Sequence, residues 1–132
     1  MSGALTYLWI ALGGALGSVA RFACAEWIVM RWPGAFPWGT LFVNVLGSLV
    51  IGTIAALGES NAPVQMPLMA RQFIMIGILG GFTTFSSFSL QTVMLMRNGA
   101  WLMAGLNAVS SVLLCVLAAW AGFALVTACL RL

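Results

Sequence analysis

The chain lacks most of the charged residues that a soluble surface needs. It has 132 residues with no His, Lys or Asp, its only acidic residues are Glu26 and Glu59, and charged residues make up 5% of it. This composition excludes a basic patch for nucleic acid. The three cysteines, Cys24, Cys115 and Cys129, lie in apolar segments without paired spacing. They are expected to be small buried hydrophobes rather than disulfides or metal ligands.

Apolar residues dominate what is present. Hydrophobic residues make up 63% of the chain, and the mean hydropathy is +1.12, which is far outside the range of soluble domains. The length leaves room for four membrane spans of about 20 residues each and for short connections. We therefore expect one all-α transmembrane domain over residues 1–132, without an extramembrane part.

Turn-forming residues divide the chain into four apolar segments. The amino-terminal segment has no basic leader before its apolar run, so we expect a retained helix rather than a cleaved signal. Trp32, Trp38 and Trp101 fall at segment ends, where indole rings favour the membrane interface. The expected spans are residues 5–29, 38–57, 68–96 and 100–130.

The arginines are balanced across the connections. With four spans, Arg71 and Arg131 lie on one side of the membrane, and Arg31 and Arg97 lie on the other. The positive-inside rule then has no bias to act on, which predicts dual topology and an antiparallel homodimer. Such a pair would reproduce the inverted repeat of larger transporters. A single orientation, set by acidic residues or by helper factors, is the alternative.

Gly13, Gly17 and Arg21 in the first segment are spaced by four and share one helix face. The glycines are typical of a close helix-packing surface. Arg21 follows only about 17 apolar residues, so it is expected near the interface. There its charge would attract anions to a vestibule.

A stripe of hydrogen-bonding groups follows the second segment, where Thr40, Asn44 and Ser48 are spaced by four. Such a stripe serves either as a polar track or as a bond between helices. Asn44 favours the track, because a neutral amide offers N–H donors to an anion without trapping it by a full charge. The fourth segment supplies a second track from Asn107, Ser110 and Ser111.

The third segment carries three glycines and five hydroxyls between residues 77 and 89. Residue 82 is its midpoint, so the sequence predicts a helix broken near the middle of the membrane, where irregular backbone survives only inside protein or along a cavity. In an antiparallel dimer, freed carbonyls from both copies would converge on the two-fold axis and bind a cation that prefers hard oxygen ligands. The candidate carbonyls are those of Gly77, Gly80 and Thr83.

Phe82 and Phe85 lie in this polar stretch and are three residues apart. On a helix they would be about 60° from each other. A ring edge is electropositive and can face an anion without binding it strongly. Packing is the alternative role for both rings.

At this point the chain resembles the small fluoride channels that export fluoride from microbes. The resemblance implies an antiparallel dual-topology homodimer with two pores, a central sodium ion held by carbonyls at the break, and phenylalanines along the anion path. It also implies pore roles for Asn44 and a fourth-helix serine. Two departures are visible: Ser87 stands where Thr is usual, and Gln91 stands where Glu is expected. The matching motifs are Gly13-xxx-Gly17-xxx-Arg21, the run from Gly39 to Ser48, and the run from Gly80 to Ser89.

The sequence therefore predicts passive fluoride export across a bacterial inner membrane, with no catalytic residue. A small multidrug-type exporter would need a carboxylate deep in the membrane, whereas Glu26 lies near a helix end and Glu59 lies in a loop. A fluoride/proton antiporter would also need a titratable acid within the membrane, and the sequence offers none. A passive assembly subunit would explain the glycine faces but not the polar tracks.

Overall fold

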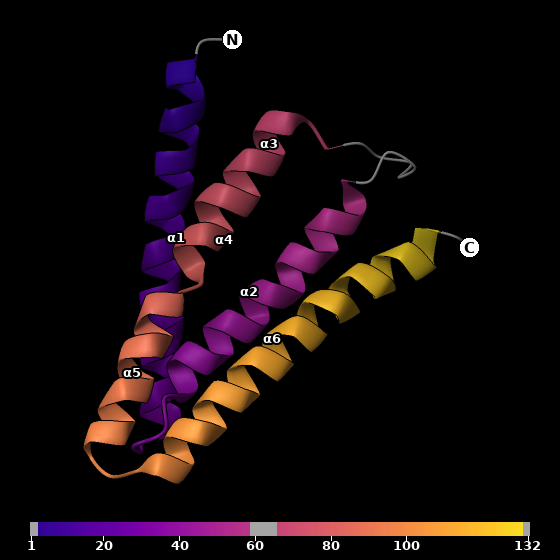
Figure 1. The fold of residues 1–132 in the computed structure, drawn as a ribbon. Helices are drawn as coiled ribbons and strands as arrows, with labels where there is room; N and C mark the ends of the chain where they lie inside the picture. Colours follow the sequence, from indigo (N-terminus) through magenta and orange to yellow (C-terminus); the bar gives the residue numbers. More distant parts are fainter. Residues whose placement is uncertain (1–2, 59–65, 131–132) are drawn as a thin grey trace.

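The computed structural model describes residues 3–58 and 66–130. The regular structure of these residues is entirely helical (Figure 1). Arg131, which entered the predicted orientation, and Glu59, which was weighed as a carboxylate for an exporter, lie outside the described residues. In chain order, the elements are α1 (Gly3–Arg31), α2 (Trp38–Leu57), α3 (Leu68–Gln72), the π-helical segment η1 (Phe73–Ile78), α4 (Leu79–Phe82), α5 (Phe85–Arg97) and α6 (Trp101–Leu130).

Four stretches are long and apolar enough to cross a membrane, which confirms the predicted number of spans. They are Gly3–Arg31, Trp38–Leu57, Leu68–Arg97 and Trp101–Leu130. The second has the bounds expected from the sequence, and the others differ from expectation by one or two residues at an end. The tight turn between the last two contains Gly99, whose φ of 74° suits a residue without a side chain.

The first and third spans run side by side with their backbones in contact. A Cβ added to Gly17 would overlap the carbonyl oxygen of Ile78, and one added to Gly13 would lie 2.8 Å from the carbonyl oxygen of Phe73. On the third span, a Cβ added to Gly81 would lie 2.5 Å from the carbonyl oxygen of Gly14. The predicted packing role of Gly13 and Gly17 is therefore confirmed.

The second and fourth spans, α2 and α6, form another close pair. A Cβ at Gly52 would overlap the Ala119 carbonyl oxygen, and one at Gly122 would overlap that of Leu49. Figure 1 shows that the two helix pairs meet at the end where α5 lies and diverge toward the end where α3 begins. The described chain is therefore V-shaped rather than a closed bundle.

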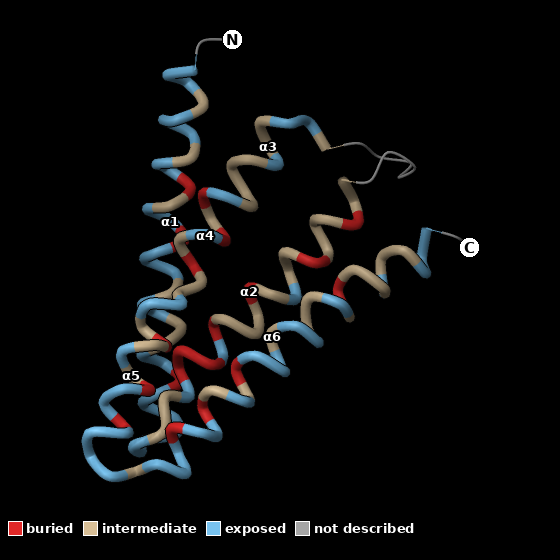
Figure 2. The backbone as a smooth tube through the Cα atoms, in the orientation of Figure 1, coloured by how far each residue is buried: buried red, intermediate tan, exposed pale blue. Residues whose placement is uncertain are grey.

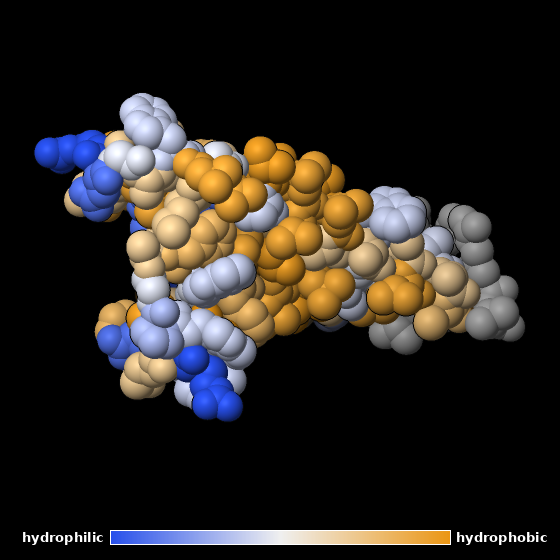
Figure 3. All heavy atoms as spheres, turned by 90° about the horizontal axis from the view of Figure 1, so that it is seen from below, coloured by the Kyte–Doolittle hydropathy of each residue, from blue (hydrophilic) through white to orange (hydrophobic). Residues whose placement is uncertain are grey.

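Most apolar side chains face outward. Figure 2 shows the buried residues confined to the lines along which helices meet. Leu16, Val19 and Phe22 on α1 are each more than half exposed. In the view of Figure 3, the strongly hydrophilic residues form small groups at one side and most of the remaining face is hydrophobic. Such a surface suits lipid or another apolar protein surface.

The third span departs from a regular helix at two places. Its first half contains the π-helical turn η1, and its helical backbone stops after Phe82. Thr83 (φ −90°, ψ 156°) and Thr84 (φ −152°, ψ 111°) are extended. A helix resumes at Phe85, where the Thr84 hydroxyl accepts the N–H of Ser87 at 3.2 Å and so caps α5.

Candidate functional site

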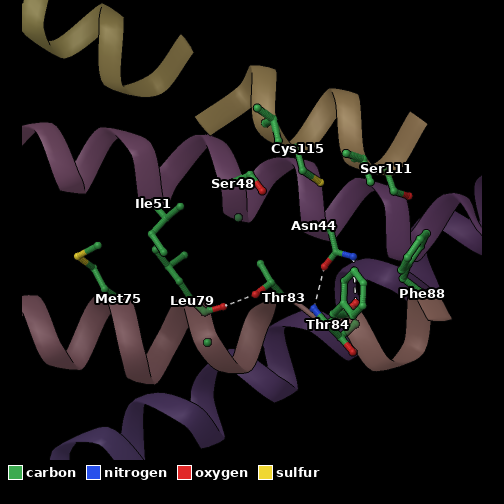
Figure 4. A pocket seen from close by; sticks show the side chains of 15 residues that line it. Asn44, Ser48, Ile51, Met75, Leu79, Thr83, Thr84, Phe88, Ser111 and Cys115 are labelled. Carbon is green, nitrogen blue, oxygen red and sulfur yellow. Dashed lines mark hydrogen bonds between the residues drawn. The ribbon is translucent and has the colours of Figure 1, made fainter. Parts of the chain in front are cut away.

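A pocket of about 410 Å³ lies where the two helix pairs separate, between α2, α6 and the interrupted third span (Figure 4). It brings together four of the predicted path residues from three different spans. None of its described lining residues carries a charge. The predicted residues that line it are Asn44, Ser48, Phe85 and Ser111, together with Gly80 and Thr83 from the predicted ion site.

Asn44 binds the interrupted backbone through both ends of its amide. Its Nδ2 donates to the Thr84 carbonyl at 3.0 Å, and its Oδ1 accepts the Thr84 N–H at 2.7 Å. In an unbroken helix, this N–H would donate to the carbonyl of Gly80. Asn44 thus replaces hydrogen bonds that the break removes, and one of its two N–H donors is left for another acceptor.

Two phenylalanine rings from α5 line this pocket. The Phe85 and Phe88 ring centroids are 5.1 Å apart with an interplanar angle of 48°. Phe88 is buried, whereas Phe85 is 74% exposed in the single chain. Both belong to the same continuous helix after the break, so their spacing of three residues places them on one side of it.

Phe82 is placed differently from Phe85. It ends α4, is buried, and lies against Gly47 of α2 rather than lining the pocket. The expectation that Phe82 and Phe85 share a helical face is wrong, because the extended Thr83 and Thr84 separate them. Sequence reasoning missed Phe88, although a helix restarting at residue 85 would have paired it with Phe85.

The other predicted path residues lie outside this pocket. Asn107 is 1% exposed and donates through Nδ2 to the Thr92 hydroxyl at 2.9 Å, so it joins α6 to α5. Ser110 donates to the Asn107 carbonyl of its own helix at 3.5 Å. Of the predicted second track, only Ser111 reaches the pocket. Thr40 is buried and lines a second pocket.

The three predicted ion-binding residues are also separated. Gly80 and Thr83 line the pocket at the break. Gly77 is buried against α1, and its carbonyl oxygen lies 4.0 Å from the position of a Cβ on Gly14. The described residues contain no group of three His, Cys, Asp or Glu side chains that could hold a metal.

The second pocket, of about 330 Å³, lies between α1, the start of α2 and α5. It gathers the Glu26 carboxylate, the Thr40 hydroxyl and the Gln91 amide. The Oε1 atom of Gln91 is buried without a hydrogen-bond partner among the described residues. Nε of Arg21 is likewise buried without a hydrogen-bond partner among the described residues.

These features define a small multi-pass membrane protein whose uncharged polar groups converge on a break in one span. Residues 8–123 match the family described as CrcB-like protein, Camphor Resistance (CrcB), and the chain belongs to this family. A relative from Opitutus terrae is 53% identical over 116 residues, which is 88% of each chain. One from Paramagnetospirillum magneticum is 52% identical over 118 residues, covering 89% of this chain and 92% of the relative. Both are named fluoride-specific ion channel FluC.

Proposed function

We propose that this protein is a fluoride-selective channel that lets fluoride leave the cell passively across its membrane. The observation that carries the proposal is the pocket at the break, which combines an amide, hydroxyls and aromatic rings without a charged lining residue among those described. The names of the relatives support the same function. Conduction of this kind needs no catalytic residue.

Fluoride is small and strongly hydrated, so a path must replace its water with other donors. Asn44 has one N–H donor left after binding Thr84, and the hydroxyls of Ser48 and Ser111 lie in the same pocket. The ring edges of Phe85 and Phe88 add weak positive potential. These neutral groups stabilise the anion without holding it, while a narrow path excludes larger anions.

The proposed path keeps Asn44, Ser48, Phe85 and Ser111 and adds Phe88. The remaining residues assigned to the path from sequence stay predictions, because their positions outside the pocket lend them less support. They are Thr40, Phe82, Asn107 and Ser110.

The proposal includes an antiparallel homodimer, with the break near the middle of the membrane. In the single chain, Phe85 lines the pocket and is largely exposed. A second copy would cover this apolar surface and close the path. The even distribution of arginines over the connections favours copies inserted in opposite directions.

A reporter fused to the carboxyl terminus tests this arrangement. Antiparallel assembly requires labelling on both sides of the membrane, whereas labelling on one side contradicts it. Adding two or three Lys residues between positions 59 and 67 should then force one orientation and abolish activity when this form is expressed alone.

The proposed dimer centre holds a sodium ion. Gly80 and Thr83 are the better-supported ligands, because both lie at the break and the usual helical donor to the Gly80 carbonyl is bound to Asn44. Gly77 has less support, since its carbonyl is directed toward α1. Sodium would supply the positive charge that lets carbonyls from both copies converge. Replacing sodium with a large organic cation should therefore lower the thermal stability of the dimer.

Liposomes containing the purified protein test the function directly. We expect fluoride efflux measured with a selective electrode and no comparable chloride efflux. A folded dimer that releases no fluoride would rule the channel out. Fluoride movement that remains strictly coupled to proton movement would instead favour a fluoride/proton antiporter.

A further inference from the structure

The pocket containing Glu26 adjoins the proposed fluoride path. Thr40 lines it one helical turn before Asn44 on α2, and Gln91 lines it three residues after Phe88 on α5. Asn44 and Phe88 line the pocket at the break. The two pockets therefore occupy successive turns of the same two helices. An anion that moved from Asn44 along α2 toward the start of that helix would therefore approach the Glu26 pocket.

The chemistry of this second pocket opposes an anion. Glu26 is the one charged residue among the described residues that line it. Gln91 adds a buried Oε1 atom for which the described residues supply no donor. Much of the remaining wall is apolar and comes from Phe22, Val29 and other side chains, which screen charge less than water does. Since Glu26 itself is exposed, its repulsion of fluoride should be moderate.

We propose that Glu26 is a flux-limiting residue of the channel, whose carboxylate slows the passage of fluoride at this end of the path. The inference rests on the proposed fluoride channel. The groups described above favour conduction, whereas Glu26 restricts it. Its consequence is unusual for a residue beside a pore, because removing its charge should make the channel faster.

A series of nearly isosteric variants changes the charge of the pocket in steps. Glu26→Gln removes the negative charge, Gln91→Glu doubles it, and the double variant moves one charge from α1 to α5. Flux is measured in liposomes at low fluoride and low ionic strength, where access of the anion limits the rate. Gly105→Ala serves as a control, because a Cβ at Gly105 meets nothing within 4 Å.

We expect Glu26→Gln to raise fluoride flux by about twofold to fivefold and Gln91→Glu to lower it by about the same factor. These factors are below the roughly tenfold or more of strongly focused fields, because Glu26 is exposed. The double variant should return toward the wild-type rate. The differences should shrink at about 1 M salt, where the Debye length is only about 3 Å.

An unchanged or lower flux for folded Glu26→Gln would overturn the inference, as would an unchanged flux for Gln91→Glu. If Glu26→Gln does not fold, the fluoride flux of Gln91→Glu alone tests the inference. Failure of the proposed function looks different, because the wild type itself would then release no fluoride. A wild type that conducts fluoride with no charge dependence in the series rejects only the role of Glu26.

Discussion

The two halves of the third span differ in what they contact and in what they carry. The first half, Leu68–Phe82, contains no hydroxyl side chain and packs through its backbone against glycines of α1. The second half, Phe85–Arg97, carries four hydroxyls, packs against α6 through the bond between Thr92 and Asn107, and directs Phe85 and Phe88 to the pocket. One half therefore anchors the span, and the other supplies its polar chemistry.

The junction between the halves belongs to neither helix. Thr83 and Thr84 are extended, and Asn44 from α2 holds the Thr84 backbone at both its N–H and its carbonyl. This comparison predicts that changes in the anchoring half damage folding, whereas changes beside the pocket damage transport in a protein that still folds.

The largest effect is expected at the anchor. In Gly17→Val, the new side chain would overlap the Ile78 carbonyl and crowd the Phe82 nitrogen, where a Cβ already lies at 2.9 Å. Overpacking costs about 1–3 kcal/mol even where side chains can adjust, and here backbone must move. We expect little folded dimer by size-exclusion chromatography.

Gly105→Val is the matched control for this change, because Gly105 has nothing within 4 Å of its Cβ position. It should leave the yield and the melting temperature close to wild type. A stable Gly17→Val dimer would mean that α1 does not anchor the third span.

The next effect is expected at the junction. Asn44→Asp loses the Nδ2 donor to the Thr84 carbonyl and places a carboxylate in the path. The carboxylate repels the permeant anion where little water screens it, so fluoride flux per folded dimer should fall by about tenfold or more. Ser48→Ala, which removes one hydroxyl from the same pocket, should cost less. Equal losses of fluoride flux in the two variants would mean that Asn44 contributes no more to the path than Ser48 does.

The sequence was sufficient to predict the four spans, because long apolar runs and Pro or Gly at their ends act locally. It also predicted an irregular third span from its glycines and hydroxyls. It could not show that the break falls at Thr83 and Thr84, because this depends on hydrogen bonds with Asn44, which is 40 residues away.

That missing detail explains why Phe88 was not paired with Phe85. A spacing of three residues relates Phe82 to Phe85 as well as Phe85 to Phe88, and only the position of the break shows that the second pair shares one helix. Asn107 was assigned to a polar track for a related reason, since its spacing from Ser111 does not reveal a bond to Thr92. Helix faces can be predicted from spacing, but the neighbour that each face meets cannot.

Replacing each ring by Ile tests whether Phe88 or Phe82 lines the path together with Phe85. Phe85→Ile and Phe88→Ile remove electropositive edges worth about 0.5–1.5 kcal/mol, so each should lower fluoride flux by about twofold to tenfold. Phe82→Ile should mainly lower the melting temperature, because Phe82 is buried outside the pocket. A loss of flux in Phe82→Ile with normal stability would support the path role that the sequence predicts for Phe82.

The smallest effect is expected at Arg21, which lies one turn beyond Gly17 on α1. Because Gly17 meets the end of α4, Arg21 lies closer to the level of the break than the interfacial position expected from the sequence. Its proposed role is to attract anions by charge, and Arg21→Lys keeps that charge while losing the buried Nε donor. We expect a change in fluoride flux of less than about twofold, as suits a partly screened charge. Arg21→Gln should reduce flux further at low salt and only slightly at high salt. If Lys were as damaging as Gln at every salt concentration, the guanidinium would contact the anion directly, and Arg21 would belong to the path itself rather than to its mouth.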